Sequence, residues 1–595
     1  MKNNNSSMQW SLKELYSSFN GEDFQKDLEL LDYKIDYFIN WSNINLNGYE
    51  NIVNKIEEYI NLMKDYKGIS GRLSSFASLR VSADANCSDA KKYIDIIEKK
   101  NTRITEVQVK FSKWLIGIKD LQESINSSKL LKEHEFYLQE IITNNNHVLS
   151  EKEEMIISKM KLTGSSAWAN LKNSLASNLL VDIDIDDKIQ EIGINNIKNM
   201  YFSNNNDLRK KAFYAERKSN EKIAEGVAAA LNGIKGEVLT LCEIKGYKSP
   251  LNKTLEDSRM DEETLNTMLK VMKENLCEFK PYYAKKAKLL GHEEKLPFYD
   301  LMAPVGKLDK KYTFEEARDF IVKHYSSFSK DMGDLALKAF NNRWIDAEVR
   351  EGKRSGAFCS NLHSIGESRV LCSFSGSFKN VCTIAHELGH AYHGSILKKE
   401  SVLNSSYPMP LAETASIFAE NIVRNAALEE ADKEESLVIL GAELTNCSSV
   451  IVDIYSRFLF EKELFERRRE SQLPLKEIKE LMVWAQKEAY GDAILEETFD
   501  GFGWIHKPHY YYAERNFYNF PYAFGLLFAK GLYSMYLKEG KSFIDKYNKV
   551  LRLTGQANVY DVAKYAGIDI HDEEFWQGSM DIIKKDIEKF CNIDI

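Results

Sequence analysis

The sequence predicts a mostly α-helical protein with a small β-sheet. The chain has 595 residues and nine prolines, so long helices can run without interruption. Segments such as 24–41, 51–66 and 89–121 carry apolar residues at three- and four-residue spacing, with charged residues between them, which is the helical period. Strand-like stretches are rare, and the best one is 369–374, bounded by two glycines.

The length of the chain predicts two or more domains or lobes, because it exceeds one compact core. The clearest change in composition lies at 177–206, where VDIDIDDK and an Asn-rich turn interrupt the helical pattern. We therefore expect an N-terminal helical lobe over 1–190 and a second domain over 191–595. The second domain carries most of the glycine, aromatic and histidine residues.

The bulk composition argues against several classes of protein. The residues are 44% hydrophobic and 28% charged, as in a folded globular protein, and the net charge of -9 does not favour nucleic acid or an anionic membrane as a partner. The first residues lack the apolar region of a signal peptide, and the apolar stretch 522–537 contains Lys530 and is short for a bilayer. We expect a cytoplasmic protein whose eight scattered cysteines are reduced, mostly buried thiols. The sequence carries no signal for an oligomeric state.

The segment TIAHELGHAYH at 383–393 contains the pattern HExxH. On a helix, His386 and His390 lie one turn apart on one face, so both imidazoles can reach one metal ion. Neutral imidazole suits Zn²⁺, and Glu387 is placed one step around the helix, where it can act on a metal-bound water as general base. A chance match on a solvated helix is the alternative, but the small and apolar flanking residues are typical of a buried helix.

A zinc peptidase needs a third protein ligand and an open fourth position. The longer pattern HExxHxxGxxH is absent, and because His393 follows His390 by only three residues we interpret it as a support for the metal ligands or as a structural residue, and not as a ligand. Downstream, a second helix is expected to begin with Glu413 in its first turn and Glu420 seven residues later on the same face. Glu413 as ligand and Glu420 as acceptor for a ligand histidine N–H would satisfy both carboxylates. Two ordinary glutamates near a helix N-terminus fit the spacing equally well.

These residues resemble a known family. HELGH, followed 23 residues after its second His by Glu413 in AETAS, resembles the thimet-oligopeptidase family and within it the oligoendopeptidase F branch. The segments 356–374 and 380–383, the opening WSLKELY and the block FYNFPY are also similar to that branch. The resemblance implies that Glu413 is the third ligand of one Zn²⁺ per chain. It also implies a two-lobed, clam-like helical fold with a deep channel that admits short, unstructured peptides.

The aromatic run WIHKPHYYY and the block FYNFPY that follows it form a second candidate region. Neutral His and Tyr side chains can donate hydrogen bonds to a developing oxyanion, although the same residues could simply pack a core. The resemblance favours a catalytic role for His509 and for one or both of Tyr518 and Tyr522. Many relatives carry a second Tyr where this sequence has Phe520 or Pro521, so the resemblance does not single out one tyrosine.

Two further features have alternative interpretations. The strand at 369–374 could pair with an extended substrate as an added strand, or it could be a plain edge strand. Cys359, Cys372 and Cys382 lie near the motif, but their spacings of 13 and 10 do not match a zinc site. We therefore expect these cysteines to be small core residues.

The sequence thus predicts a zinc-dependent endopeptidase that hydrolyses internal bonds of short peptides. Glu387 takes a proton from the zinc-activated water and later passes it to the leaving amine. An HExxH carboxypeptidase of similar helical fold is one alternative. A different amidohydrolase that acts on small substrates is a second. A non-catalytic metal- or peptide-binding protein is a third, although it would have no need for a base at Glu387.

Overall fold

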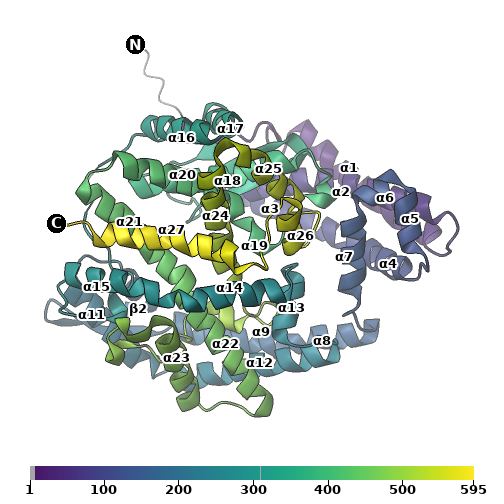
Figure 1. Ribbon diagram of the computed structural model, residues 1–595. Helices are drawn as coiled ribbons and strands as arrows, with labels where there is room; N and C mark the ends of the chain where they lie inside the picture. The colour runs from purple at the N-terminus through teal and green to yellow at the C-terminus, as the bar shows by residue number, and fades with distance from the viewer. Residues whose placement is uncertain (1–6, 308–309, 595) are drawn as a thin grey trace. The chain divides into compact units, whose positions relative to one another are not determined.

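The computed structural model of the protein describes residues 7–307 and 310–594. Over these residues the chain is dominated by α-helices, with one two-stranded and one three-stranded sheet (Figure 1). The predicted mostly α fold with a small sheet is confirmed. The chain divides into two compact units: unit 1 is Met1–Asn146, Asp309–Ala426 and Met535–Gly567, and unit 2 is His147–Leu308, Ala427–Ser534 and Ile568–Ile595.

Unit 1 begins with a series of amphipathic helices. These are α1 (Glu22–Asn45), α2 (Ile52–Ala83), α3 (Ser88–Thr102), α4 (Ile104–Ile116), α5 (Leu121–Ser127), α6 (Lys129–Glu133) and α7 (Glu135–Asn145). Their apolar faces form one buried core, in which the rings of Tyr59 and Phe111 stack at 3.4 Å. The helical periodicity was correct at all three predicted segments, but 89–121 is broken at Arg103 and again at Gly117.

The remaining elements of unit 1 are helices and the three strands of one sheet. They are α16 (Phe314–Phe328), α17 (Lys330–Asn341), β3 (Ile345–Asp346), β4 (Phe358–Leu362), β5 (Glu367–Leu371), α18 (Phe378–Leu397), α19 (Met409–Ala412), α25 (Phe543–Leu553) and α26 (Val559–Tyr565). The helices α20 (Thr414–Glu430) and α24 (Phe520–Glu539) contribute to both units.

The sheet has the strand order β3-β5-β4, so the strand predicted at 369–374 lies in the middle. β5 pairs parallel with β3 and antiparallel with β4. Neither interpretation of that strand holds, because a central strand is not an edge and has no free side along which an extended peptide could be added. The helix α18 packs against both β4 and β5.

The segment around residue 190 is a β-hairpin that the sequence analysis overlooked. β1 (Leu180–Ile185) pairs antiparallel with β2 (Lys188–Gly193). Asp186 and Asp187 occupy the turn with φ of 52° and 59°, and positive φ at both central residues is what a type I′ turn requires. The signal was the alternation in VDIDI, which buries Val181 and Ile183. Each compact unit is assembled from three chain segments, whereas the predicted domains 1–190 and 191–595 are two continuous parts of the chain. The predicted division stays a prediction.

The other elements of unit 2 are helices. They are α8 (Glu151–Thr163), α9 (Ser165–Ser177), α10 (Ile194–Met200), α11 (Asn206–Asn220), α12 (Ala224–Ile244), α13 (Pro250–Asp257), α14 (Glu262–Glu274), α15 (Lys280–Leu289), α21 (Lys433–Ser448), α22 (Ile454–Glu470), α23 (Leu475–Tyr490) and α27 (Glu573–Cys591). A π-helical turn, η5 (Ser449–Asp453), joins α21 to α22. By length and composition alone the run Lys433–Glu470 could cross a membrane, but 61% of its most apolar window is buried, as in the core helix of a globular protein.

All eight cysteines are free thiols in the structure. Only Cys242, Cys372 and Cys447 are buried, and Cys277 is exposed, so the expectation of mostly buried thiols was wrong. Of the three cysteines near the HExxH motif only Cys372 is buried, so the expectation of core residues is wrong for Cys359 and Cys382, which are partly exposed.

Candidate metal centre and catalytic loop

The helix α18 presents the HExxH motif in unit 1. Its first turn is fixed by a capping box, in which the Ser377 hydroxyl accepts from the Asn380 N–H and the Asn380 side chain accepts from the Ser377 N–H. The rings of His386 and His390 lie on one face with centroids 5.1 Å apart. The face around Gly389 is buried against α20.

Gly389 allows α18 and α20 to approach each other closely. A Cβ at this position would lie 2.6 Å from the Ala415 carbonyl oxygen, 2.6 Å from the Ser416 Cα and 2.8 Å from the Ala419 Cβ. Only glycine fits such an approach without moving a backbone. The absence of a side chain at Gly389 therefore brings α20, and the acids near its start, up to the two histidines.

The sequence analysis expected Glu413 in the first turn of a helix, but the residue lies between two helices. It follows α19 and precedes α20, with φ of -89° and ψ of 0°. The Ser416 hydroxyl donates to its Oε2 at 2.8 Å and to its main-chain oxygen at 3.1 Å. This break in the helix directs the carboxylate toward His386 and His390.

The atoms of the three predicted ligands converge. Glu413 Oε2 lies 3.2 Å from His386 Nε2 and 3.5 Å from His390 Nε2, and one ligand atom from each residue lies within 4.8 Å of the others. Ligands about 2.0–2.1 Å from a tetrahedral zinc are separated from one another by about 3.3 Å. The set of two imidazoles and one carboxylate therefore fits a divalent metal in both chemistry and spacing.

Electrostatics favours a cation at this cluster. Burial alone would raise the pKa of Glu413, but hydrogen bonds to both histidines hold it well below its usual range, so the carboxylate stays ionised. Burial alone would lower the pKa of His386, but Glu413 and Glu420 raise it to about 10. The negative charges of Glu413 and Glu420, which favour a proton on the imidazole, would also attract a metal cation.

Glu420 occupies the position that a supporting acceptor needs. Its Oε2 lies 3.2 Å from Nδ1 of His386, and Arg424 lies 3.8 Å from its other oxygen. A carboxylate on Nδ1 places the proton there and leaves Nε2 as the lone pair that a metal requires. The geometry matches the pairing expected from sequence.

Glu387 differs from the other acids of the site because it lacks a partner. Its side chain is buried, and its Oε2 makes no hydrogen bond with the described residues. Burial raises the pKa of this carboxyl, while the charges of His386 and His390 oppose the rise. A desolvated carboxylate without a fixed donor is free to accept a proton from a reacting water.

Neighbouring candidates do not join the cluster. His393 is fully buried, its Nε2 lies 2.9 Å from the Thr554 hydroxyl, and its ring stacks on Tyr407 at 4.3 Å. Burial lowers the pKa of His393 to about 3, so it stays neutral in the core. The group that could hold a metal ion among the described residues consists of His386, His390 and Glu413.

In unit 2 the structure gathers His509, Tyr518 and Tyr522 into one aromatic cluster. The His509 ring lies 4.7 Å from that of Tyr518, which lies 5.9 Å from that of Tyr522. Tyr512 joins the cluster at 5.8 Å from Tyr518, a residue that the sequence analysis did not single out from its run. Other members of the run, Trp504, Tyr510 and Tyr511, are buried core residues, so the packing interpretation is correct for them.

Asn519 sets the proton position on His509. The Asn519 Oδ1 accepts from Arg457 Nη1 at 3.2 Å, and the same oxygen lies 3.0 Å from His509 Nδ1. Arginine can only donate, so the shared atom is an oxygen and Nδ1 must carry the proton. Burial and the Arg457 charge lower the pKa of His509. In the neutral ring Nε2 is therefore an acceptor, and of the three predicted groups only the tyrosine hydroxyls donate without a further proton.

One charged face of α22 holds this loop. Arg457 and Glu461 lie one turn apart, and Glu461 Oε2 accepts from the main-chain N–H of Phe517 at 3.0 Å. Phe517 has φ of 50°, a left-handed conformation that is strained for a bulky residue. The buried ammonium of Lys235 donates to Glu461 at 2.6 Å and to Asn516 at 3.0 Å. These bonds maintain the backbone turn from which Tyr518 projects.

Comparison with known proteins decides the family. A sequence model of Peptidase family M3 matches residues 199–582, more than half of the chain, and a second model, described as Oligopeptidase F, matches residues 116–179. The chain belongs to peptidase family M3. This M3 peptidase is 27% identical over 512 residues to Oligopeptidase PepF of Bacillus subtilis, a match that covers 85% of the chain and 76% of the relative. It is 23% identical to the Oligoendopeptidase F homolog of Borreliella burgdorferi, with 99% of the chain and 98% of the relative covered.

The resemblance to the oligoendopeptidase F branch is thereby confirmed, and the chain is a peptidase. Solved structures share the fold of this M3 peptidase. Oligoendopeptidase-F from Enterococcus faecium has a TM-score of 0.66 at 18% identity, and the match covers 96% of this chain and 98% of the Enterococcus chain. A protein from Chlamydophila abortus has a TM-score of 0.86 at 22% identity, and the match covers 99% of this chain and 98% of the Chlamydophila chain.

Proposed function

We propose that this M3 peptidase is a zinc-dependent endopeptidase that cleaves internal bonds of short, unstructured peptides. The observation that supports it most is the convergence of His386, His390 and Glu413 beside the unpartnered carboxylate of Glu387. The names of the relatives, oligopeptidase and oligoendopeptidase, support short peptides as substrates and internal bonds as targets. Zinc is proposed because two imidazoles, one carboxylate and an open position are a common catalytic zinc set.

The chain's own residues account for the proton movements. A zinc ion held by the three ligands would lower the pKa of a water and polarise the scissile carbonyl. Glu387 Oε2 accepts the proton that this water loses as it attacks, and then delivers it to the leaving amine. Glu420 keeps the proton of His386 on Nδ1, so that Nε2 remains a ligand.

Tyr518 and Tyr522 are proposed as donors to the oxyanion. A phenol hydroxyl carries its own proton to donate, whereas His509 can donate from Nε2 only as an imidazolium, which burial and Arg457 disfavour by lowering its pKa. His509 then serves to pack against Tyr518 and fix its ring. We further propose a cytoplasmic location, with peptides and not nucleic acid as partners, in keeping with the net charge of -9.

The test uses a peptide blocked at both ends, whose fragments are identified by mass spectrometry with and without a chelator. Internal cleavage that stops on chelation and returns with zinc is the expected result. Release of C-terminal residues from unblocked peptides only would support the carboxypeptidase alternative and refute the proposal.

Variants separate the roles of the acids. Glu387→Gln should retain metal and fold but lose turnover, since the amide cannot accept the proton. His386→Ala should lose the metal, and Glu413→Ala should weaken its binding. Glu22→Gln, at an exposed glutamate of α1, is the matched control and should behave as wild type. Turnover near the wild-type rate in Glu387→Gln would exclude Glu387 as the base.

A further inference from the structure

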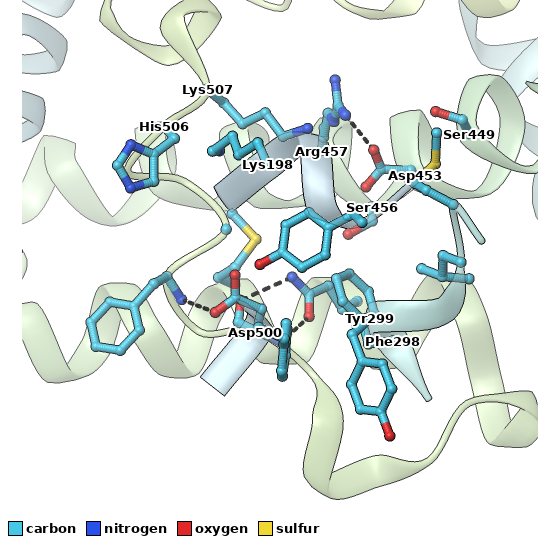
Figure 2. A pocket seen from close by; sticks show the side chains of 18 of the residues that line it. Lys198, Phe298, Tyr299, Ser449, Asp453, Ser456, Arg457, Asp500, His506 and Lys507 are labelled. Carbon is cyan, nitrogen blue, oxygen red and sulfur yellow. Dashed lines mark hydrogen bonds and ion pairs between the residues drawn. The ribbon is translucent and has the colours of Figure 1, made fainter. Parts of the chain in front are cut away.

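Unit 2 contains a cavity of about 330 Å³ that the peptidase chemistry does not use. It is lined by α10, α11, α21, η5, α22, α23 and the loop that leads to His509. In Figure 2 the side chains of Lys198, Lys507 and Arg457 extend toward one end of the pocket, and Phe298 and Tyr299 lie toward the other. The volume corresponds to on the order of ten water molecules, which is enough for a small organic molecule.

The polar end of the cavity presents hydrogen-bond donors that lack partners. Arg457 Nε and the Tyr510 hydroxyl are buried and make no hydrogen bond with the described residues. The Lys507 ammonium lines the same cavity, also without a hydrogen bond or ion pair to the part of the chain that is described. Burial raises the pKa of Tyr510 well above its usual range, so its hydroxyl keeps its proton. Such a set of donors calls for a ligand that accepts.

Lys507 is the cation at this end that has no acidic partner among the described residues. Arg457 is paired with Asp453, and Lys198 lies 3.6 Å from Glu216. These two cations and two anions are the groups that act on Lys507, and their charges cancel. Burial and Arg457 lower the pKa of Lys507 to about 8, so the side chain is still largely protonated at pH 7. Asp500, the third acid of the lining, has a pKa of about 6 and balances the charge of the cavity at pH 7, but its Oδ1 already accepts from the main-chain N–H of Phe502. A carboxylate on a ligand would give Lys507 the acidic partner that it lacks.

The rest of the lining is apolar and aromatic. Phe202, Phe298, Tyr299, Met302 and Phe502 form much of it. The π-helical turn η5 adds Ser449 and Asp453, and such turns occur frequently at functional sites. An apolar pocket with a few convergent polar groups at one end is the usual form of a small-molecule site.

We propose that this cavity binds a small organic carboxylate with an aromatic or branched apolar body. The carboxylate accepts from Lys507, Arg457 and Tyr510, and the apolar body contacts the aromatic wall. Because Arg457 also donates to Asn519, the acceptor for His509, occupancy of the cavity should alter turnover. That coupling alone rests on the proposed function, whereas binding does not.

The test is isothermal titration calorimetry of the zinc-loaded enzyme with 3-phenylpropanoate. Saturable binding of one molecule per chain is expected, with the neutral 3-phenylpropanamide at least about tenfold weaker because it lacks the charge-assisted hydrogen bonds. N-acetyl-phenylalanine serves as a second probe: its binding would indicate a peptide C-terminus as the source of the carboxylate, and its exclusion a free small acid. Absence of saturable binding by both acids, or equal affinity for acid and amide, would overturn the proposal.

Variants locate the binding. Lys507→Met should fold, since the ammonium has no partner to lose, and should weaken 3-phenylpropanoate at least about tenfold. Tyr510→Phe should also weaken binding without lowering the melting temperature. Lys476→Met, at an exposed lysine of α23, is the control and should leave affinity unchanged. Unchanged affinity in Lys507→Met would mean that the acid binds elsewhere, for instance at the metal, and would refute the site. Binding without any change in kcat would refute only the coupling.

Discussion

The glycine within the metal-binding motif tests how the two ligand-bearing segments are held together. In Gly389→Ala the new Cβ would lie 2.6 Å from backbone atoms of Ala415 and Ser416. Carbon contacts become favourable only near 3.5 Å, so α20 must move away from α18 by about 0.9 Å. Two of the three contacts are with backbone, and rotation of a side chain cannot relieve them.

This movement would separate Glu413 from its histidine partners. Metal–ligand distances tolerate changes of only about 0.2 Å, so a shift several times larger should abolish tight metal binding. The overpacking itself should lower the free energy of unfolding by about 1–3 kcal/mol. We therefore expect the variant to fold, with reduced stability, little bound zinc and little activity.

The assay measures zinc per chain after dialysis, urea unfolding and kcat/KM on a quenched peptide. Gly71→Ala is the matched control, because a Cβ at that helical position in α2 meets nothing within 4 Å. It should raise stability by about 0.4–1 kcal/mol and leave zinc and activity unchanged. Full zinc content and wild-type kcat/KM in Gly389→Ala would show that the close approach of α18 and α20 does not position the ligands.

Four further predictions follow from the contacts of the site and its supports. Glu420→Gln should keep the fold but weaken zinc about 10–100-fold in a chelator competition, and unchanged affinity would exclude a role through His386. Tyr518→Phe or Tyr522→Phe should lower kcat about 10²–10³-fold with little change in KM or melting temperature, and His509→Gln should lower kcat by a smaller factor. If both tyrosine variants keep wild-type kcat, the oxyanion donors lie elsewhere. Lys235→Met should destabilise the protein by about 3–5 kcal/mol because Glu461 is left buried and unpaired. The double variant Lys235→Met, Glu461→Gln should regain much of that stability, as measured by calorimetric unfolding. Burial and Glu216 raise the pKa of Asp500 to about 6, so the folded state holds a proton that the unfolded state has lost, and the free energy of unfolding should fall as pH rises from 4 to 6. Asp500→Asn should remove this pH dependence in unfolding measured across pH, and an unchanged pH dependence would show that Asp500 is not its source.

Within single elements the sequence was a reliable guide. The apolar periodicity predicted α1 and α2, and the spacing of HExxH placed His386 and His390 on one helical face. Errors arose where two local signals compete. The acidic residues in VDIDI concealed a strand that alternates in burial, and the helix-compatible residues around Glu413 concealed the break that orients it.

The sequence by itself determined the helical class and the paired histidines, and it predicted Glu387 as the base and, through family resemblance, Glu413 as the third ligand. These features depend on residues a few positions apart or on a motif of fixed spacing, so chain geometry alone relates them. The tertiary structure decided the rest: the approach of α20 at Gly389, the carboxylate of Glu420 on His386, and the donors left without partners around Lys507. Such contacts join residues tens to hundreds of positions apart, and which of them form depends on how the helices pack, which no local pattern specifies.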